Sequence, residues 1–456
     1  MIEEIVTISE FPTAVDLDGD YDMTQAALLL GSLTDGELVL QNFNSGKDTA
    51  GTVSLLTGMG HSVSLTDDEV RVRRGEQPVG DDCTELIFDG GMMPLTMLVG
   101  MIAGRNITCH LRYSPEINPD LLDELINVLN KIGVDIVQPQ ERELIIRESR
   151  IAPIELRLNS PLPYIKNCLL MIGLCSGCSV TIKEDRAAPG CLERLIERLG
   201  GDLSKRTRKM IWRENPNDPR KRERVADMDC AREIKLGVSS KLRGGIVEIP
   251  PDTIESSALL ALSVLARNDL ALQRILLDRR LSRFMQYLKA SGITTETTNK
   301  ETIDGRPYAD LAISGSQLKG RKISGATAFA LIEQVPFMAV MAATSAGTTI
   351  IRDTGGLHCA LVRPFDEIVE NLTLMDVKCG MLEDGLAIEG ARELNGADFG
   401  PFDNRTVALA FYLVALAGAG KSYFNGFEIV NEHYPKFVRM MMNQSRHQPA
   451  EMGRQL

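Results

Sequence analysis

The same succession of secondary-structure elements occurs six times along this chain of 456 residues. Each copy consists of an apolar helix rich in small residues, a tight turn, a β-branched strand, an amphipathic helix and a further strand. The copies recur at intervals of roughly 70–90 residues, which is too long for a solenoid repeat and suits a βαβαββ module. The sequence therefore predicts six such modules in a mixed α/β (α+β) fold. The apolar helices are expected at 27–33, 97–104, 168–175, 258–266, 338–344 and 408–416.

Each module also carries its own turn and its own amphipathic helix. Glycine or asparagine is expected after each apolar helix, because the chain reverses there through positive φ. Gly133, Gly200 and Gly292 each end an amphipathic helix and precede a strand, which is typical of a right-handed crossover. The turns are expected at Gly36, Gly104, Gly177, Asn268, Gly347 and Gly418. The amphipathic helices, with apolar residues at i, i+3, i+4 and i+7, are expected at 48–58, 119–132, 192–199, 280–290, 364–375 and 434–442.

Composition narrows the class of protein. The length predicts two or three domains, and an apolar content of 44% is enough for a sizeable core. The net charge of −12 argues against a nucleic-acid-binding protein. Nine cysteines form no dense, even framework, and the acidic start Met1–Glu4 does not resemble a signal peptide, so we expect a cytoplasmic protein.

The sequence also lacks the patterns of a membrane span and of a metal site. The longest apolar stretch, 407–420, is shorter than the roughly 18 residues that a membrane span requires, so no membrane association is expected. The CxxC sequence at 175–178 stands without a second pair at metal-binding spacing. We therefore expect neither a cofactor nor a metal site.

A basic segment interrupts the third module. Residues 205–224 carry nine basic and three acidic side chains. We interpret the segment as a solvated loop or strand pair. The alternative is a patch for an anionic partner such as a nucleic acid, against which the net acidity counts. Residues 234–245 then lead into the fourth module and are the expected domain crossing, with three modules on either side.

Several segments occur in the order and spacing of one known family. They are Leu17-Asp-Gly19 with the helix from Ala27, Asp48-Thr49, 112–133, 331–340 with 346–352, and Asp403-Asn-Arg405. Together they resemble the enolpyruvyltransferases, and within them the EPSP synthase (3-phosphoshikimate 1-carboxyvinyltransferase) family. The resemblance runs nearly from end to end of the chain.

The resemblance implies a two-lobed, enolpyruvyltransferase-like fold that is similar to an inside-out α/β barrel. Residues 15–240 would form the lobe of modules 1–3, and 1–14 with 241–456 the lobe of modules 4–6. A small molecule would bind in the cleft between the lobes. The family's reaction, in the shikimate pathway of aromatic amino acid biosynthesis, joins phosphoenolpyruvate to a hydroxyl of shikimate 3-phosphate.

Joining two anions requires fixed cations and a carboxylate poised for proton transfer. The chain departs from the family at most of the positions that would supply them. The family's Lys-Ser pair corresponds to Tyr21-Asp22, a later arginine to Ala26, the phosphate-binding Ser-x-Gln to Leu162-Pro-Tyr164, the phosphoenolpyruvate-facing arginine to Asp120, and a lysine before the last helix to Glu432. The family's Lys-Glu-Ser-Asp-Arg falls on 360–364, where Arg363 could replace the arginine after a shift of one residue.

Three features agree with the family. Glu333 replaces the catalytic aspartate by a longer carboxylate, Arg405 keeps the arginine of the last module, and Asp48 is retained. Glu333 could equally be a surface carboxylate of a helix, and Arg405 a structural arginine at a helix start. The candidate site is therefore Glu333 as the catalytic residue, with substrate-binding Arg405, Tyr21, Asp22, Asp48, Tyr164 and Arg363.

Acidic groups in place of cations would repel phosphoenolpyruvate. We therefore interpret the chain as an EPSP-synthase-like protein with an eroded substrate site, that is, a pseudoenzyme or a re-purposed small-molecule-binding paralogue. The alternative is an active carboxyvinyltransferase, of the shikimate pathway or on another hydroxyl acceptor. Arg363, Lys166 or Lys47 would then supply the positive charge.

Overall fold

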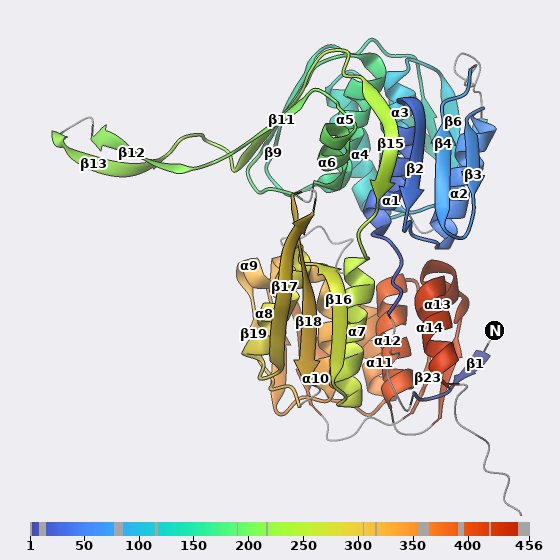
Figure 1. Cartoon of the computed structure of the whole chain (residues 1–456), viewed down its shortest axis with the longest axis vertical. Coiled ribbons are helices and arrows are strands. Elements are labelled where there is room, and N and C mark those ends of the chain that lie inside the picture. Colours follow the sequence, from blue (N-terminus) through green and yellow to red (C-terminus); the bar gives the residue numbers. More distant parts are fainter. Residues whose placement is uncertain are drawn as a thin grey trace, which may run out of the picture. The chain divides into compact units, whose positions relative to one another are not determined.

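The computed structural model describes residues 2–8, 15–76, 85–114, 117–188, 190–215, 218–303, 305–314, 317–353, 364–390, 396–418 and 421–445. The chain divides into two compact units (Figure 1). Unit 1 consists of Met1–Asp20, Asn44–Gly46 and Pro250–Leu456, and unit 2 of Tyr21–Phe43 and Lys47–Ile249. The sequence placed these boundaries at 14/15 and 240/241, six and nine residues before the observed 20/21 and 249/250. It gave no sign that the short segment 44–46 belongs to unit 1.

Three modules show one complete strand order. The first strand of the module precedes the apolar helix and pairs in parallel with the second strand, which follows that helix. The fourth strand lies between the second and the third strands and pairs antiparallel with both. This pairing is the βαβαββ module that the repeat predicted. The strands are β5 (Glu85–Phe88), β6 (Cys109–Tyr113), β7 (Ile136–Gln140), β8 (Glu143–Ile146), β9 (Ile154–Leu158), β10 (Val180–Glu184), β11 (Leu203–Thr207), β14 (Arg232–Leu236), β19 (Lys322–Ile323), β20 (Thr348–Ile351), β21 (Cys379–Leu382) and β22 (Gly385–Glu389).

Two other modules take a strand from a distant part of the chain. In module 1, β2 (Thr34–Gln41) pairs in parallel with β15 (Leu242–Glu248), which follows module 3. In module 6, β24 (Ser422–Asn425) pairs antiparallel with the N-terminal strand β1 (Ile2–Ile5). The remaining strands are β3 (Ser62–Leu65), β4 (Glu69–Arg73), β16 (Leu270–Leu276), β17 (Thr294–Ile303), β18 (Arg306–Ser314) and β23 (Asp398–Phe399).

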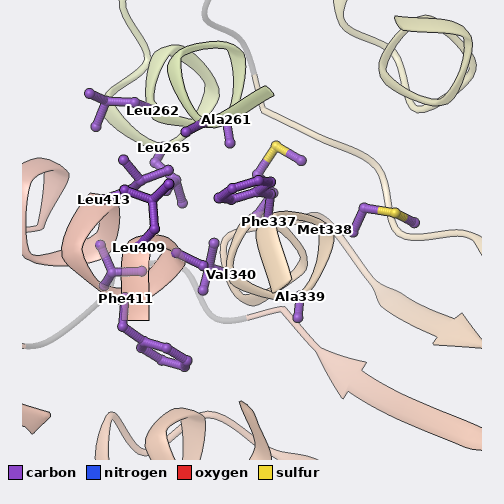
Figure 2. Close-up of a cluster of buried hydrophobic side chains, with 14 of the residues drawn as sticks. Ala261, Leu262, Leu265, Phe337, Met338, Ala339, Val340, Leu409, Phe411 and Leu413 are labelled. Atoms are coloured by element: carbon purple, nitrogen blue, oxygen red, sulfur yellow. The ribbon is translucent and has the colours of Figure 1, made fainter. Parts of the chain in front are cut away.

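The apolar helices form the cores of the two units, because a helix that is hydrophobic all round must be covered on every side. Every residue of α10 is buried, for example. Figure 2 shows side chains of α7, α10 and α12, including Ala261, Phe337 and Leu409, packed in one cluster of unit 1. The sheets are separate and do not close into a barrel. These helices are α1 (Tyr21–Gly31), α3 (Met92–Gly104) and α5 (Pro163–Ser176) in unit 2, and α7 (Thr253–Ala266), α10 (Val335–Ala343) and α12 (Arg405–Ala417) in unit 1.

The amphipathic helices lie within a few residues of their expected ranges. They bury one face and end where the sequence placed glycines: Gly133, Gly200 and Gly292 all have positive φ. The helices are α2 (Lys47–Gly58), α4 (Pro119–Lys131), α6 (Cys191–Arg198), α8 (Arg279–Ala290), α11 (Pro364–Leu374) and α14 (Pro435–Ser445).

Only half of the expected turns fall where the sequence placed them. Gly36, Gly177 and Gly347 adopt positive φ, as expected. Gly104, however, is still part of α3, and the residue with positive φ after this helix is Asn106. In module 4 the residue with positive φ is Arg267, one position before the expected Asn268. The last expected turn, Gly418, caps α12 with extended backbone. These helices end at slightly different points, and the left-handed position moves with the helix end.

The basic segment forms strands, as one of the two sequence interpretations expected. After β11 the chain forms a separate two-stranded antiparallel sheet of β12 (Met210–Asn215) and β13 (Asp218–Ala226) (Figure 1). The remaining short elements are α9 (Gly325–Ala330), the 3-10 helix η1 (Ile332–Gln334) and α13 (Glu428–His433). Within the described ranges, no helix has the length and apolar character that crossing a membrane requires.

Candidate functional site

Glu333 lies in unit 1, in η1, directly before α10. Its Oε2 atom accepts a hydrogen bond from Arg280 Nη1 at 2.9 Å, and its side chain is 42% exposed. Arg280 belongs to the first turn of α8, where it also donates through Nη2 to Asp20 Oδ2 at 3.1 Å and through Nε to Asp278 Oδ2 at 2.9 Å. Three carboxylates therefore share one guanidinium.

This cluster fixes the orientation of Glu333 and leaves part of its side chain exposed to solvent. Hydrogen bonds between ionised partners are about twice as strong as neutral ones, so Arg280 is an effective anchor. With one positive and three negative groups, the cluster favours a cation or a hydrogen-bond donor over a phosphate. Sequence reasoning missed Arg280, because 260 positions separate it from Asp20. The only local signal was a charged side chain at the start of an amphipathic helix.

Arg405, the second site residue predicted in unit 1, is the first residue of α12. The N-cap of that helix, Asn404, accepts hydrogen bonds from the N–H groups of Thr406 and Val407. Arg405 Nη1 lies 3.5 Å from Nδ1 of His433, at the end of α13. Arg405 is thus a helix-start arginine, as its structural interpretation expected, and its guanidinium also faces an imidazole.

Tyr21 and Asp48 meet in unit 2. The Tyr21 hydroxyl, at the start of α1, donates a hydrogen bond to Asp48 Oδ2 at 2.5 Å, and Asp48 is buried in the first turn of α2. Gly91, the N-cap of α3, lies against the same phenol, because a Cβ atom there would be only 2.8 Å from the Tyr21 hydroxyl. The starts of three helices therefore meet at this pair, and their dipoles favour the negative charge of Asp48.

The next turn of α1 is neutral and buried. Gln25 donates to Thr49 Oγ1 at 3.2 Å and accepts a hydrogen bond from Thr52 Oγ1 at 2.6 Å. Ala26, at the position where the resemblance places an arginine, is fully buried in the core. Asp22 is a partly exposed residue of the first turn. The described part of α1 thus contains no cationic side chain.

Tyr164 repeats the phenol–carboxylate arrangement. Its hydroxyl, at the start of α5, donates a short hydrogen bond to Glu124 of α4. Burial, and then the bond to this carboxylate, hold the pKa of Tyr164 well above its usual range, so the phenol keeps its proton. Asn118 caps α4 by accepting from the N–H of Asp120 and Leu121. Asp120 itself is exposed, and Glu124 was not predicted from the sequence.

Lys166, one of the predicted sources of positive charge, lies enclosed inside unit 2. Its side chain is completely buried, and its Nζ lies 2.8 Å from Glu193 Oε1 and 3.4 Å from Glu184 Oε1. Arg232 also bonds Glu184, at 2.6 Å. Two buried carboxylates therefore neutralise this lysine inside unit 2. Of the other predicted cations, Lys47 is the first residue of α2, and Arg363 lies outside the described residues.

The fold of this chain is that of the enolpyruvyl transferases. The structure of EPSP synthase from Acinetobacter baumannii superposes with a TM-score of 0.76 at 18% identity and covers 97% of this chain and 98% of that one. The enolpyruvyl transferase NikO from Streptomyces tendae superposes with a TM-score of 0.70 at 15% identity, covering 97% of both chains. At these identities the likeness is one of fold.

Sequence comparison then gives the family. The model of EPSP synthase (3-phosphoshikimate 1-carboxyvinyltransferase) matches residues 6–228 and 229–441, and the chain belongs to this family. The 3-phosphoshikimate 1-carboxyvinyltransferases of Synechococcus sp. (strain JA-3-3Ab) and Acaryochloris marina are similar to it at 25% and 26% identity. The first match covers 93% of this chain and 92% of its relative, and the second 92% and 91%. The resemblance inferred from the motifs is confirmed, and the chain is a divergent member.

Proposed function

We propose that this protein is an EPSP-synthase-like paralogue whose site no longer takes phosphoenolpyruvate and shikimate 3-phosphate, and which binds a neutral or cationic small molecule instead. The observation that carries the proposal is the Tyr21–Asp48 hydrogen bond. Where the family resemblance places a lysine, this chain has a phenol that donates to a buried carboxylate. A phosphate oxygen would meet a neutral hydroxyl and a negative charge there.

Two further features support the proposal. Tyr164, in the segment where the resemblance places a phosphate-binding Ser-x-Gln, donates to Glu124. Ala26, where the resemblance places an arginine, is buried as a methyl group. Each charge-assisted hydrogen bond contributes about 1.5–3 kcal/mol, so losing several of them would weaken binding by several powers of ten.

An active carboxyvinyltransferase on another hydroxyl acceptor is the second candidate. It is favoured by Glu333, a partly exposed carboxylate that Arg280 holds in one orientation and that is suited to proton transfer. Arg405, retained from the family motif, would contribute positive charge. Both candidates are consistent with the cytoplasmic setting expected from the sequence, since the cysteines of the described residues are free thiols.

Binding and turnover of the family substrates test the first candidate. We expect no saturable heat of binding for phosphoenolpyruvate with shikimate 3-phosphate, and no release of phosphate. Tyr21→Lys with Asp22→Ser should gain affinity by about 10–100-fold, the equivalent of one charge-assisted bond. Tyr423→Lys, on a partly exposed tyrosine of β24, is the matched control and should gain nothing. Turnover of the natural pair by the unmodified protein would refute the proposal.

The second candidate is tested with phosphoenolpyruvate and a panel of neutral and amine-bearing alcohols. If one of them releases phosphate, Glu333→Ala should lower the rate by about 100-fold or more, as expected for loss of a general acid or base. Glu389→Ala removes an exposed carboxylate of β22 and should leave the rate unchanged. An unchanged rate in Glu333→Ala would remove the role proposed for that residue.

A further inference from the structure

The chain passes between the two units through three short segments of unit 1. It leaves or enters that unit after Asp20, at the two ends of 44–46, and before Pro250. We call 18–20, 44–46 and 250–252 the crossing segments. They contact one another: Gly19 forms a β-bridge with Pro251, and the Asp252 N–H donates to Asp18 O at 2.8 Å. All four passages of the chain between the two units begin or end at these segments.

Asp18 forms hydrogen bonds and an ion pair with several segments of unit 1. Its buried carboxylate accepts hydrogen bonds from Ser45 N at 3.2 Å and from Ser45 Oγ at 2.9 Å. Lys436 Nζ of α14 lies 3.5 Å from the same Oδ1 atom. The Asp18 N–H in turn donates to Glu255 Oε2 at 2.9 Å, across 237 positions of sequence. One residue therefore connects two crossing segments with helices α7 and α14.

Glu255 is fully buried in the first turn of α7, and among the residues that the structure describes its Oε1 atom has no hydrogen-bond partner. Asp252, the N-cap of that helix, uses its own carboxylate to accept the N–H groups of Ile254 and Glu255. If Glu255 were ionised, its Oε1 atom would carry negative charge in the interior without a hydrogen-bond donor from the described residues, which is energetically costly. Within the described ranges, no group of three His, Cys, Asp or Glu side chains is placed to hold a metal ion that could compensate this charge.

The charged and titratable groups around Glu255 oppose its ionisation. Burial is the main cause that raises the pKa of Glu255 well above its usual range; the charges of Asp18 and Asp252 add to it, and Lys436 acts against it. Tyr434, the C-cap of α13, also interacts electrostatically with Glu255, Asp252 and Arg405. Burial raises the pKa of Asp18 as well, but Lys436 and Ser45 counteract this rise. Since Asp18 has these compensating partners, Glu255 is the group that keeps the proton.

We propose that Glu255 is a proton-operated clamp on the crossing segments: protonated, it holds them against α7, and on losing its proton it releases them. The inference does not depend on the proposed function. If Glu255 were also ionised, it would add a third negative charge to those of Asp18 and Asp252, against the one positive charge of Lys436. Glu255 can ionise at low cost only where water reaches it, which requires the hydrogen bond from Asp18 to open. Opening is therefore linked to the loss of one proton.

The test is hydrogen exchange of the full chain, measured at individual amides between pH 6 and 9 and corrected for intrinsic exchange. Protection of the Asp18 and Asp252 amides should fall with rising pH, approaching about tenfold per pH unit, the slope for release of a single proton. The amide of Thr406, bonded to the neutral N-cap Asn404, serves as the internal control and should keep its protection. Unchanged protection of Asp18 across this range would overturn the proposal.

Glu255→Gln separates titration from packing, because glutamine keeps an acceptor for the Asp18 N–H and does not ionise. In this variant the protection of the Asp18 amide should be independent of pH. Glu248→Gln, at the end of β15 just before the last crossing segment, changes an exposed carboxylate and should retain the pH dependence of the unmodified protein. A Glu255→Gln variant that behaves like the unmodified protein would equally refute the clamp. The exchange of the unmodified protein decides the question if the variant does not fold.

Discussion

Replacing Lys166 by methionine is expected to destabilise unit 2 by about 3–5 kcal/mol, the usual cost of removing one partner from a buried ion pair. Methionine preserves most of the apolar stem of the side chain, so little of the loss comes from packing. Lys166 has no exposed surface, and neither do its partners Glu184 and Glu193. Without the ammonium group, Arg232 is the cation that the two buried carboxylates still share among the described residues, at 2.6 Å from Glu184 and 3.4 Å from Glu193.

The measurement is urea unfolding of the full chain, followed by tryptophan fluorescence and by circular dichroism. Trp212, the single tryptophan, belongs to β12 in unit 2. Because two units need not unfold together, the free energy is taken from the transition assigned to unit 2. Lys166→Met combined with Glu193→Gln removes one of the two carboxylates left with too few partners. This double variant should recover part of the lost stability, and a double-mutant cycle gives the coupling energy.

Lys183→Met is the matched control, since that lysine is partly exposed and lies 3.4 Å from the exposed Glu155. Surface pairs contribute about 0–1 kcal/mol, so this change should cost at most about 1 kcal/mol. A Lys166→Met variant as stable as the control would show that the buried network is not structural. It would also restore Lys166 as a candidate for binding an anionic ligand.

Three smaller changes test other parts of the structure. Arg280→Gln leaves three carboxylates without their shared cation and should lower the unfolding free energy by at least about 1.5 kcal/mol, where Arg283→Gln on the same helix should have little effect. Asn404→Ala removes the N-cap of α12 and should cost about 1 kcal/mol by urea unfolding, with an unchanged midpoint as the contradicting result. Burial, and then the charges of Arg105 and Arg74, lower the pKa of His61 to about 4. Because the unfolded chain binds the proton more tightly, stability should fall by up to about 3 kcal/mol as the pH drops from 6.5 towards 4, and this part of the loss should be absent from His61→Gln.

The candidate site could be predicted only in part from the sequence. Tyr21, Asp48 and Tyr164 were identified because motif spacing locates a position in a family pattern. The partners that give these residues their chemistry were not, since no pattern along the chain links Tyr164 with Glu124 or Glu333 with Arg280. The same limit applied to Lys166, which the sequence presented as an available cation and the structure encloses between two glutamates.

The sequence alone determined the six modules, the apolar helices that form the cores of the two units, and the family. Whether a residue is buried follows a period of two in strands and of 3.6 in helices, and such periods can be read from the order of residues. Only the tertiary structure decided that β1 completes the sixth module, that β15 completes the first, and that Asp18, Ser45, Glu255 and Lys436 gather where the chain leaves unit 1. Such contacts join positions as far apart in the sequence as Ile2 and Asn425. Their energies depend on burial and on distances between atoms, which have no period along the chain.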